Sequence, residues 1–253
     1  MPADTLLGWV FGSLLLSLRI SPVFALAPPF SLTRVPAMFR TLLGVAIAAC
    51  LAAANPAAAA ITDFSVGALF VTAIRELMLG SIFVLAFQLM FAALYMAGRT
   101  IDIQAGYGLA LLIDPTTRTQ TPLVGTLFAY AAGAIFFSMD GHADLLRILG
   151  ASLEAIPLGT GELPVSLARL TAFTSVVFLT SFGVAGGAIL SLFLADMSIA
   201  ALARTAPQMN ALVLGFQVKT ILLLLVLPAT FGFAGALLAR MAVITLEALP
   251  GLL

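Results

Sequence analysis

Charged residues are scarce in this chain. Of its 253 residues, 9% are charged and 62% are hydrophobic, and the mean hydropathy is +1.18. Soluble globular domains average about 25% charged residues, so this composition predicts an integral membrane protein in contact with lipid. The 11 basic residues balance the 11 acidic ones, and without net charge the chain has no long-range field to attract nucleic acid. Nucleic acid is therefore excluded as an expected partner.

Residues that bind metals or form disulfides are nearly absent. The chain has one cysteine, Cys50, and one histidine, His142, and its carboxylates do not pair at helical spacing on an apolar face. A zinc or catalytic metal site needs such clusters, and the glycines near residue 106 lack the GK[ST] of a phosphate-binding loop. We interpret Cys50 as a small buried hydrophobic residue. We expect a protein that is not an enzyme and has no metal, cofactor or internal disulfide.

Long apolar segments make up most of the chain. A helix needs about 20 residues to cross about 30 Å of hydrocarbon. The apolar segments are 6–26, 39–54, 64–97, 122–139, 170–195 and 211–239. Because only helices and closed barrels satisfy their backbone polar groups in lipid, we expect an all-α, polytopic membrane protein with about six long helices and no strands. Pro22 and Pro228 predict kinks, and segment 64–97 is too long for one simple crossing.

Several charged side chains lie inside or at the ends of these apolar segments. They are Arg19, the adjacent Arg75 and Glu76, Asp196 and Lys219. A charge at the bilayer centre costs about 2.5 to 3.5 kcal/mol on insertion scales, so these side chains need partners or shielding by protein. Two interpretations remain open: the charges line a transport pathway, or they are buried against other subunits of an assembly.

One stretch, "RTAPQMNALVLGFQVK" at 204–219, concentrates polar residues between two apolar segments. Pro207 predicts a helix break, and Gln208 and Asn210 can satisfy the amides and carbonyls that the break frees. Arg204 precedes the break, and Lys219 follows it inside an apolar run. We expect a joint between helices or between subunits here.

The order of motifs along the chain is specific. "RISPVFALAPPF" is followed by "RELMLGSIF", "AGRTIDIQAGYGLALLIDP", "GHADLLRILGASLEAIPLG" and "RTAPQMNALVLGF". Together these motifs resemble the FliR family, the export-gate subunits of flagellar type III secretion systems, which are homologous to the SctT-type proteins of virulence systems. The resemblance covers nearly the whole chain.

The resemblance implies a single export-gate domain over 1–253, made of a FliP-like part (approximately 1–165) and a FliQ-like part (166–253). It implies helical hairpins in a helical multi-subunit assembly with FliP-like and FliQ-like subunits and a FlhB-like subunit. The expected location is the bacterial inner membrane, at the flagellar basal body. In such an assembly the polar and charged side chains would face neighbouring chains; the residues expected at subunit interfaces are Arg75, Glu76, Arg204, Pro207, Gln208, Asn210 and Lys219.

A loop rich in glycine and leucine, GYGLALLIDP, interrupts the first half of the chain. Glycines permit unusual backbone conformations, the apolar residues lack the spacing of a membrane helix, and an Asp-Pro turn follows. A constriction of bulky apolar side chains can close a pore by excluding water, although such a loop can also pack on its own subunit. We expect a pore plug formed by Gly106, Tyr107, Gly108, Leu109, Leu111, Leu112, Ile113, Asp114 and Pro115.

The expected mechanism is passive gating. The chain would close the secretion pore and let unfolded flagellar subunits pass, while a separate ATPase and the proton-motive force supply the energy. One alternative is a secondary transporter that uses Arg75, Glu76, Asp196 and Lys219 as an intramembrane coupling site. Another is the equivalent SctT-type subunit of a virulence secretion system.

Overall fold

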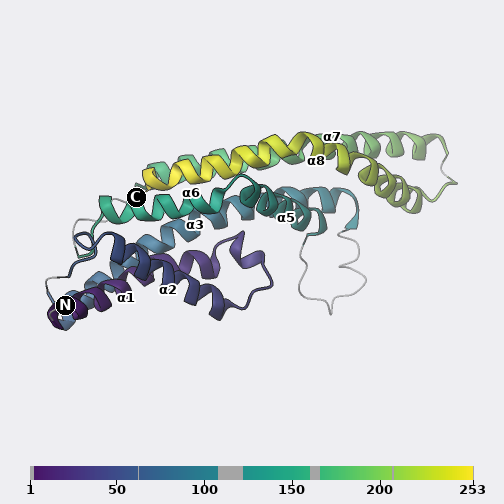
Figure 1. Cartoon of the computed structure of the whole chain (residues 1–253). Helices are drawn as coiled ribbons and strands as arrows, with labels where there is room; N and C mark the ends of the chain where they lie inside the picture. Colours follow the sequence, from purple (N-terminus) through teal and green to yellow (C-terminus); the bar gives the residue numbers. More distant parts are fainter. Residues whose placement is uncertain (1–2, 62, 108–121, 160–165, 207, 253) are drawn as a thin grey trace. The chain divides into compact units, whose positions relative to one another are not determined.

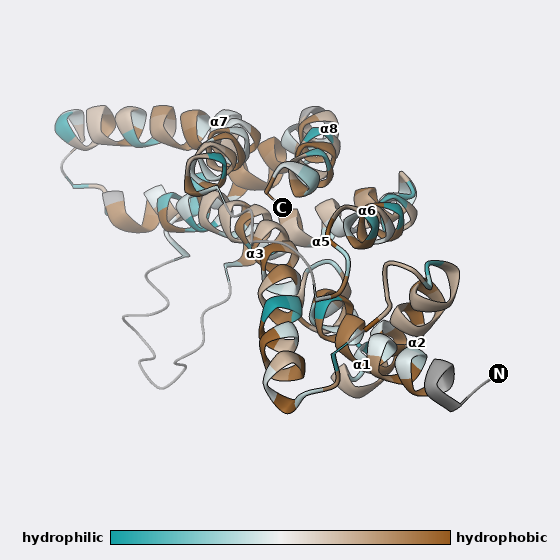
Figure 2. Ribbon diagram, turned by 90° about the vertical axis from the view of Figure 1, so that its left-hand side faces the viewer, coloured by the Kyte–Doolittle hydropathy of each residue, from teal (hydrophilic) through white to brown (hydrophobic). Residues whose placement is uncertain are grey.

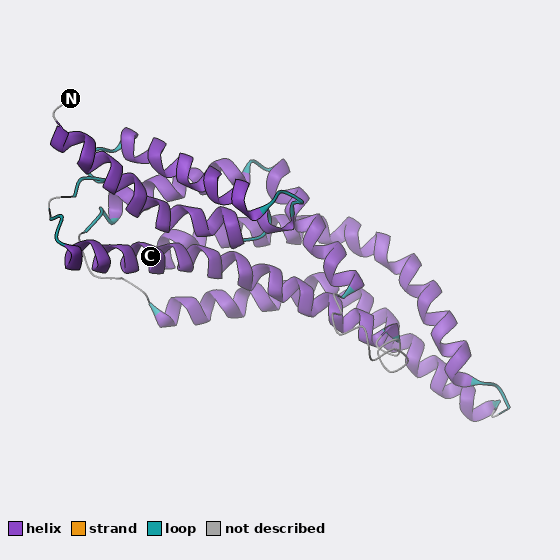
Figure 3. Cartoon of the chain, turned by 90° about the horizontal axis from the view of Figure 1, so that it is seen from below, coloured by secondary structure: helices purple, strands orange, loops and turns teal. Residues whose placement is uncertain are grey.

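The structure is a computed structural model that describes residues 3–61, 63–107, 122–159, 166–206 and 208–252. Within these ranges all regular secondary structure is helical and no residue lies in a strand (Figure 3). Figure 1 labels the α-helices: α1 (Ala3–Leu26), α2 (Ala37–Ala54), α3 (Val66–Gln104), α5 (Leu123–Ser138), α6 (Gly141–Ala155), α7 (Leu167–Thr205) and α8 (Ala211–Leu252). A short 3-10 helix, η1 (Phe30–Leu32), precedes α2. The all-α prediction is confirmed.

Six helical stretches of the described chain are long and apolar enough to cross a membrane. The pair α5 and α6 adds a seventh if it counts as one span, bent by 72° where the two helices meet. Helices α3 and α7 each have 39 residues, which at about 1.5 Å per residue is about 58 Å and well beyond the hydrocarbon thickness. Parts of these helices therefore lie outside the hydrocarbon or are strongly tilted.

The end of α2 agrees with the local sequence, whereas hydropathy underestimates the lengths of α7 and α8. Helix α2 stops at Ala54, as Asn55 and Pro56 lead one to expect, and the Asn55 backbone N–H donates to the Leu51 carbonyl. By contrast, α7 and α8 extend past the predicted apolar segments 170–195 and 211–239 and include Asp196 and Arg240. Pro228 lies within α8, inside its predicted segment. One charge or one proline does not end a long helix when its neighbours keep the backbone hydrogen bonds.

The chain divides into two compact units that alternate along the sequence. The first contains residues 1–89, 136–174 and 242–253, and the second contains residues 90–135 and 175–241. The division of the chain near residue 165 into FliP-like and FliQ-like parts is of a different kind, based on resemblance, and stays a prediction.

The first unit is built around α1, which packs against α2 and closely approaches α3. A Cβ atom at Gly80 of α3 would lie 2.5 Å from the Arg19 carbonyl oxygen of α1, so only glycine allows this approach. Aromatic rings complete the core, with the Phe87 and Phe136 ring centroids 5.7 Å apart. Cys50 is exposed on α2, so the prediction that it is buried is wrong.

The second unit contains the end of α3, most of α5 and the parts of α7 and α8 on either side of their joint. Its core includes Phe128 of α5 and Phe231 of α8, whose ring centroids are 5.4 Å apart. Many apolar side chains of α7 and α8 nevertheless stay exposed, with Leu179 at 75% and Leu225 at 71%. In Figure 2 brown, hydrophobic colouring runs along these helices. Such surface requires lipid or another protein as its neighbour.

Candidate functional site

A fully buried ion pair joins α1 to α3. The Arg19 Nε–H donates to Glu76 Oε2 at 2.7 Å, and Nη2 donates to Oε1 at 2.9 Å. The two side chains are 0% and 3% exposed. This two-pronged geometry is the strongest way for a guanidinium to bind a carboxylate, and it removes the cost of leaving either charge alone in an apolar core.

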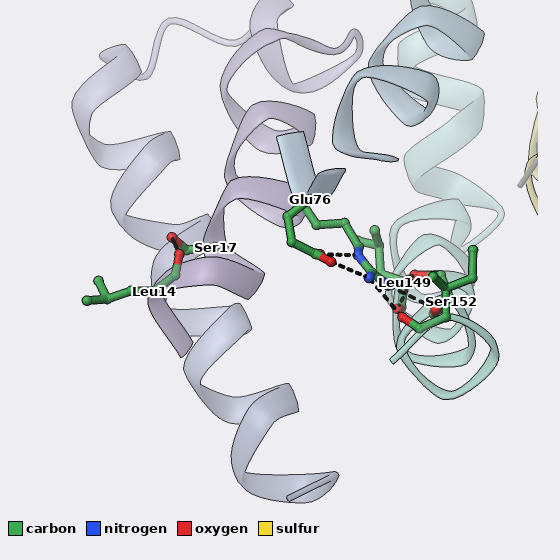
Figure 4. Close-up of polar contacts among 7 residues, drawn as sticks. Leu14, Ser17, Glu76, Leu149 and Ser152 are labelled. Atoms are coloured by element: carbon green, nitrogen blue, oxygen red, sulfur yellow. Dashed lines mark hydrogen bonds and ion pairs between the residues drawn. The ribbon is translucent and has the colours of Figure 1, made fainter. Parts of the chain in front are cut away.

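The same guanidinium also binds the end of α6. Arg19 Nη1 donates to the Ser152 carbonyl at 2.9 Å and to its Oγ at 3.3 Å, and Nη2 donates to the Ile156 carbonyl at 2.9 Å. Figure 4 shows Glu76 and Ser152 connected through this group by dashed lines. The five hydrogen bonds match the five N–H donors of an arginine. Because the last carbonyls of a helix carry negative charge, a cation is favoured at this end of α6.

Glu76 therefore has its partner within the chain. Both charges were visible in the sequence, but their pairing was not, since they are 57 residues apart. The available signal was the occurrence of opposite charges in two different apolar segments, 6–26 and 64–97. Arg75, the residue before Glu76 in α3, is half-buried. A role for Arg75 and Glu76 at a subunit interface stays a prediction.

A second ion pair links α7 to α8 in the other unit. Lys219 Nζ pairs with Asp196 Oδ1 and also donates to the backbone carbonyl of Gln104, the last residue of α3, at 3.1 Å. The side chains of Lys219 and Asp196 are 18% and 35% exposed. The structure thus places two of the embedded charges in one contact, and the expected position of Lys219 at a subunit interface stays a prediction.

The start of the predicted plug loop lies beside this pair. Gly106 has a φ of 91°, a conformation that favours glycine, and it turns the chain just after α3. The Tyr107 ring lies edge-on to Phe216 of α8, with centroids 6.4 Å apart. The remaining predicted plug residues lie outside the described residues: Gly108, Leu109, Leu111, Leu112, Ile113, Asp114 and Pro115.

The polar joint between α7 and α8 forms the expected break. Arg204 lies in the last turn of α7, and Pro207 lies outside the described residues. The Asn210 Oδ1 accepts the Val213 backbone N–H at 3.3 Å, which is the role of a helix N-cap. The prediction that Asn210 satisfies a freed amide is confirmed. Arg204, Gln208 and Asn210 are exposed, and their role between subunits stays a prediction.

The first unit contains an uncharged groove between α1, α2 and α3. Its volume is about 790 Å³, and apolar side chains line it together with a few hydroxyls and Gln88. Arg19 and Glu76 do not line it. Across the described ranges, no three His, Cys, Asp or Glu side chains gather where they could hold a metal ion. These features provide neither a charged binding cavity nor a metal centre in this part of the molecule.

Comparison with known proteins identifies the family. The model of a family described as "Bacterial export proteins, family 1" matches residues 10–243. The flagellar biosynthetic protein FliR of Bacillus subtilis is 28% identical over 247 residues, which cover 95% of this chain and 93% of that protein.

Two further relatives are also a flagellar and a secretion-system protein. FliR of Escherichia coli is 29% identical over 202 residues, covering 79% of this chain and 76% of that protein. The secretion system apparatus protein SsaT of Salmonella typhimurium is 30% identical over 146 residues, covering 57% and 56%. With a family model that matches most of its length, the chain belongs to the bacterial export proteins of family 1, the FliR family.

Proposed function

We propose that this chain is a non-enzymatic subunit of a flagellar type III protein export gate. It would close the secretion pore and open to let unfolded flagellar subunits pass. The observation that carries the proposal is the match to a flagellar biosynthetic protein along 95% of this chain and 93% of that relative. The six long apolar helical stretches of the described chain agree with a gate embedded in a membrane.

The flagellar assignment is favoured over the virulence one by coverage. FliR of Bacillus subtilis matches along 95% of this chain, whereas SsaT matches along 57%. Since the two identities are nearly equal, at 28% and 30%, the longer match carries the distinction. The corresponding location is the bacterial inner membrane, at the flagellar basal body.

The proposed partners are FliP-like and FliQ-like gate subunits and a FlhB-like subunit. The outward apolar side chains of α7 and α8 support such an assembly, because helices about twice the hydrocarbon thickness in length expose more apolar surface than lipid alone can cover. Neighbouring subunits would cover the remaining apolar surface, including the strongly exposed Leu212 and Leu225. The exposed residues of the α7–α8 joint would then lie at a subunit boundary.

The proposed closing element is the loop GYGLALLIDP. Its leucines would form a water-excluding constriction, which stops ions because a narrow apolar passage is costly to hydrate. Contacts between apolar side chains are individually weak, so a chain pushed through the pore would separate them without chemistry. The gate itself would convert no energy; a separate ATPase and the proton-motive force would supply it.

The carrier alternative is less well supported. A coupled carrier needs charges that bind and release an ion from a cavity. In this chain the Arg19 guanidinium has a partner for each of its N–H groups, and the groove between α1, α2 and α3 has no charged lining residue. The paired charges therefore act better as internal supports than as a coupling site.

The plug is tested by changing Leu109 and Leu112 together to Ser in cells that express the whole gate. We expect the assembled complex to leak ions or small dyes while its yield stays normal. The conservative change of both residues to Ile serves as the matched control and should stay tight. An assembled Ser variant that is as tight as the parent contradicts the plug.

The assembly is tested by purification in mild detergent. A gate subunit should copurify in a fixed complex with FliP-like and FliQ-like proteins, and cells without the chain should not swim. A chain that is stable alone or as a homo-oligomer, and that moves ions in vesicles, would instead support the carrier.

A further inference from the structure

The groove between α1, α2 and α3 has apolar walls and lies entirely within residues 1–89 of the first compact unit. Three of the side chains that line it, Val45, Leu77 and Leu85, are exposed at their outer surfaces, so the groove is open from the side. A polar ligand would find few hydrogen-bond partners between such walls. The groove therefore suits an apolar occupant.

The few polar side chains in the groove are already engaged within the chain. Gln88 Nε2 donates to the carbonyl of Leu26, the last residue of α1, at 2.9 Å. Every polar side chain that lines the groove donates to a backbone carbonyl in this way: Ser17, Ser21, Thr41, Ser81 and Gln88. None of these donors requires a polar ligand.

The groove is about as long as one leaflet of a bilayer is deep. Its wall on α3 runs from Leu77 to Gln88, which at about 1.5 Å per residue is about 16 Å. The hydrocarbon core of a bilayer is about 30 Å thick, so one leaflet contributes about 15 Å. The apolar wall thus matches the depth of a lipid acyl chain.

A basic side chain lies at the end of the groove where α1 stops. Arg40 Nη1 donates to the Ala25 carbonyl at 2.6 Å, and both Ala25 and Thr41, the neighbour of Arg40, line the groove. Within the described chain this is the one hydrogen bond of Arg40, and its Nε is buried without an acceptor. Because Arg40 is only half-buried, its guanidinium is accessible and still has N–H groups to donate.

The sequence around Arg40 contains no carboxylate that could neutralise it. Between Asp4 and Asp63 the chain has three arginines and no aspartate or glutamate. Arg19 is paired with Glu76, which leaves Arg40 and the exposed Arg34.

Arg40 also lies in the first turn of α2, where the positive end of the helix disfavours a cation unless an anion is near. An arginine at the end of a membrane helix reaches the level of the lipid headgroups, and basic groups there attract anionic lipids. A lipid phosphate is therefore a suitable partner for Arg40.

We propose that this groove binds one anionic phospholipid, with an acyl chain between α1, α2 and α3 and the phosphate on Arg40. A planar guanidinium binds phosphate oxygens strongly. An apolar helix of a neighbouring subunit would cover the same walls but would leave Arg40 without an anion, so a lipid is favoured as the occupant. Lipid binding at this place is independent of the proposed pore closure.

The experiment uses the purified complex that contains the unmodified chain. It is reconstituted with phosphatidylglycerol that carries a photoreactive group in one acyl chain, irradiated, and analysed by peptide mass spectrometry. We expect labels on the groove, at Val45 and Leu85. Unlabelled phosphatidylglycerol should compete about fivefold better than phosphatidylcholine, since a basic residue at the membrane surface gives about this preference. Inorganic phosphate should not compete, because it has no acyl chain.

Variants separate the two parts of the site. Arg40→Gln should lower the labelling of the groove about fivefold, whereas Arg40→Lys keeps the charge and should keep most of the labelling. Ser81→Trp, at an exposed lining position, fills the groove with a bulky ring and should also lower the labelling. Arg147→Gln, which changes an exposed residue of α6, is the matched control and should label like the parent.

Labelling that is unchanged in both Arg40→Gln and Ser81→Trp overturns the proposal, because the label would then report only the general lipid around the helices. Equal competition by phosphatidylcholine, or loss of labelling in Ser81→Trp alone, overturns the recognition of an anionic headgroup. Displacement by inorganic phosphate would show a simple anion site. An unlabelled groove in the assembled complex would show that another subunit covers it. If the Arg40 variants do not assemble, competition in the unmodified complex still decides between these outcomes.

Discussion

The Arg19–Glu76 pair and the Asp196–Lys219 pair each give a charged side chain in an apolar segment a partner of opposite sign, but the two pairs differ in their exposure to water. The first is 0% and 3% exposed and lies in the first compact unit, where it joins α1, α3 and α6. The second is 18% and 35% exposed and lies in the second unit, beside the start of the predicted plug. A pair without water cannot be broken cheaply, whereas a partly hydrated pair can exchange partners.

The embedded charges of this chain therefore differ in their roles. Arg19 binds Glu76 and the end of α6 within its own chain and acts as a permanent support between helices. Lys219 binds a helix end that leads into a segment with a proposed moving role, where a weaker contact suits repeated opening. The embedded charges should therefore not be treated as one coupling site.

The largest expected effect follows removal of the buried guanidinium. Arg19→Met leaves Glu76 without its partner and frees the Ser152 and Ile156 carbonyls at the end of α6, and breaking a buried pair costs about 3 to 5 kcal/mol. We expect the assembled complex to be lost or nearly lost, as measured by the yield of the purified gate. Glu76→Ala should lower the yield for the same reason.

A double variant sharpens this result. Arg19→Met with Glu76→Leu removes both charges and should recover part of the yield, because apolar replacement of a whole buried pair is often tolerated. Arg147→Ala, which breaks the exposed contact with Asp144, serves as a surface control with little effect. A Glu76→Ala complex with normal yield and no transport would instead favour the coupling-site alternative.

The next effect concerns the joint before α8, where polar groups are exposed. Changing Gln208 and Asn210 together to Leu removes the Asn210 N-cap of α8, which is worth about 1 kcal/mol. It also removes any contact of these two side chains with a neighbouring subunit. We expect reduced assembly and reduced swimming.

Asn210→Ser separates the two causes, since serine keeps the cap. If assembly drops in Asn210→Ser with Gln208→Leu, contact with a neighbour matters beyond the cap. Normal yield and swimming in the double Leu variant would show that the joint is only a solvated loop.

A smaller effect is expected at the half-exposed pair. Asp196→Asn removes the charge partner of Lys219 but leaves the Gln104 carbonyl contact. The free energy of unfolding should therefore fall by about 1 kcal/mol or less, as for exposed ion pairs. Thermal unfolding of the purified complex measures it. A loss as large as that of Arg19→Met would remove the distinction between the two pairs.

The smallest effect belongs to Asp63, which lies between α2 and α3. The Ser65 backbone N–H, donating to Asp63 Oδ1 at 2.8 Å, and the Ser65 side chain hold the pKa of this carboxyl below its ordinary value. A lowered folded pKa stabilises the fold fully above the unfolded pKa, which is about 3.9 for aspartate, and the gain is lost as pH falls through the folded pKa. Asp63→Asn should therefore slightly flatten the acid limb of the unfolding curve, and an unchanged curve contradicts this.

Much of the fold could be predicted because the signals are local. The break before α8 was predicted from Pro207 and Asn210, since caps and prolines act within one turn. The end of α2 at Ala54 coincides with the end of the predicted segment 39–54. The full lengths of α7 and α8 were not predicted, because hydropathy reports lipid contact and falls near Asp196 while the helix continues.

The candidate site was predicted only in part. Each embedded charge could be recognised by its cost in an apolar segment, and the loop containing Gly106 by its composition. Asp102, whose carboxylate accepts the Val124 backbone N–H at the start of α5, was not singled out, because an aspartate near a glycine-rich loop looks solvated until that helix start is placed beside it. The available signal was its position, two residues before the end of α3.

By itself the sequence determined that the chain is helical, that it lies in a membrane, and where its charges and breaks occur, because composition and helix propensity act over a few neighbouring residues. Only the tertiary structure decided which charges meet. Arg19 reaches Glu76 across 57 positions and Lys219 reaches Gln104 across 115, and such contacts depend on how the helices pack. Close packing of α3 on α1 at Gly80 places Glu76 within hydrogen-bond distance of Arg19, which local sequence patterns do not encode.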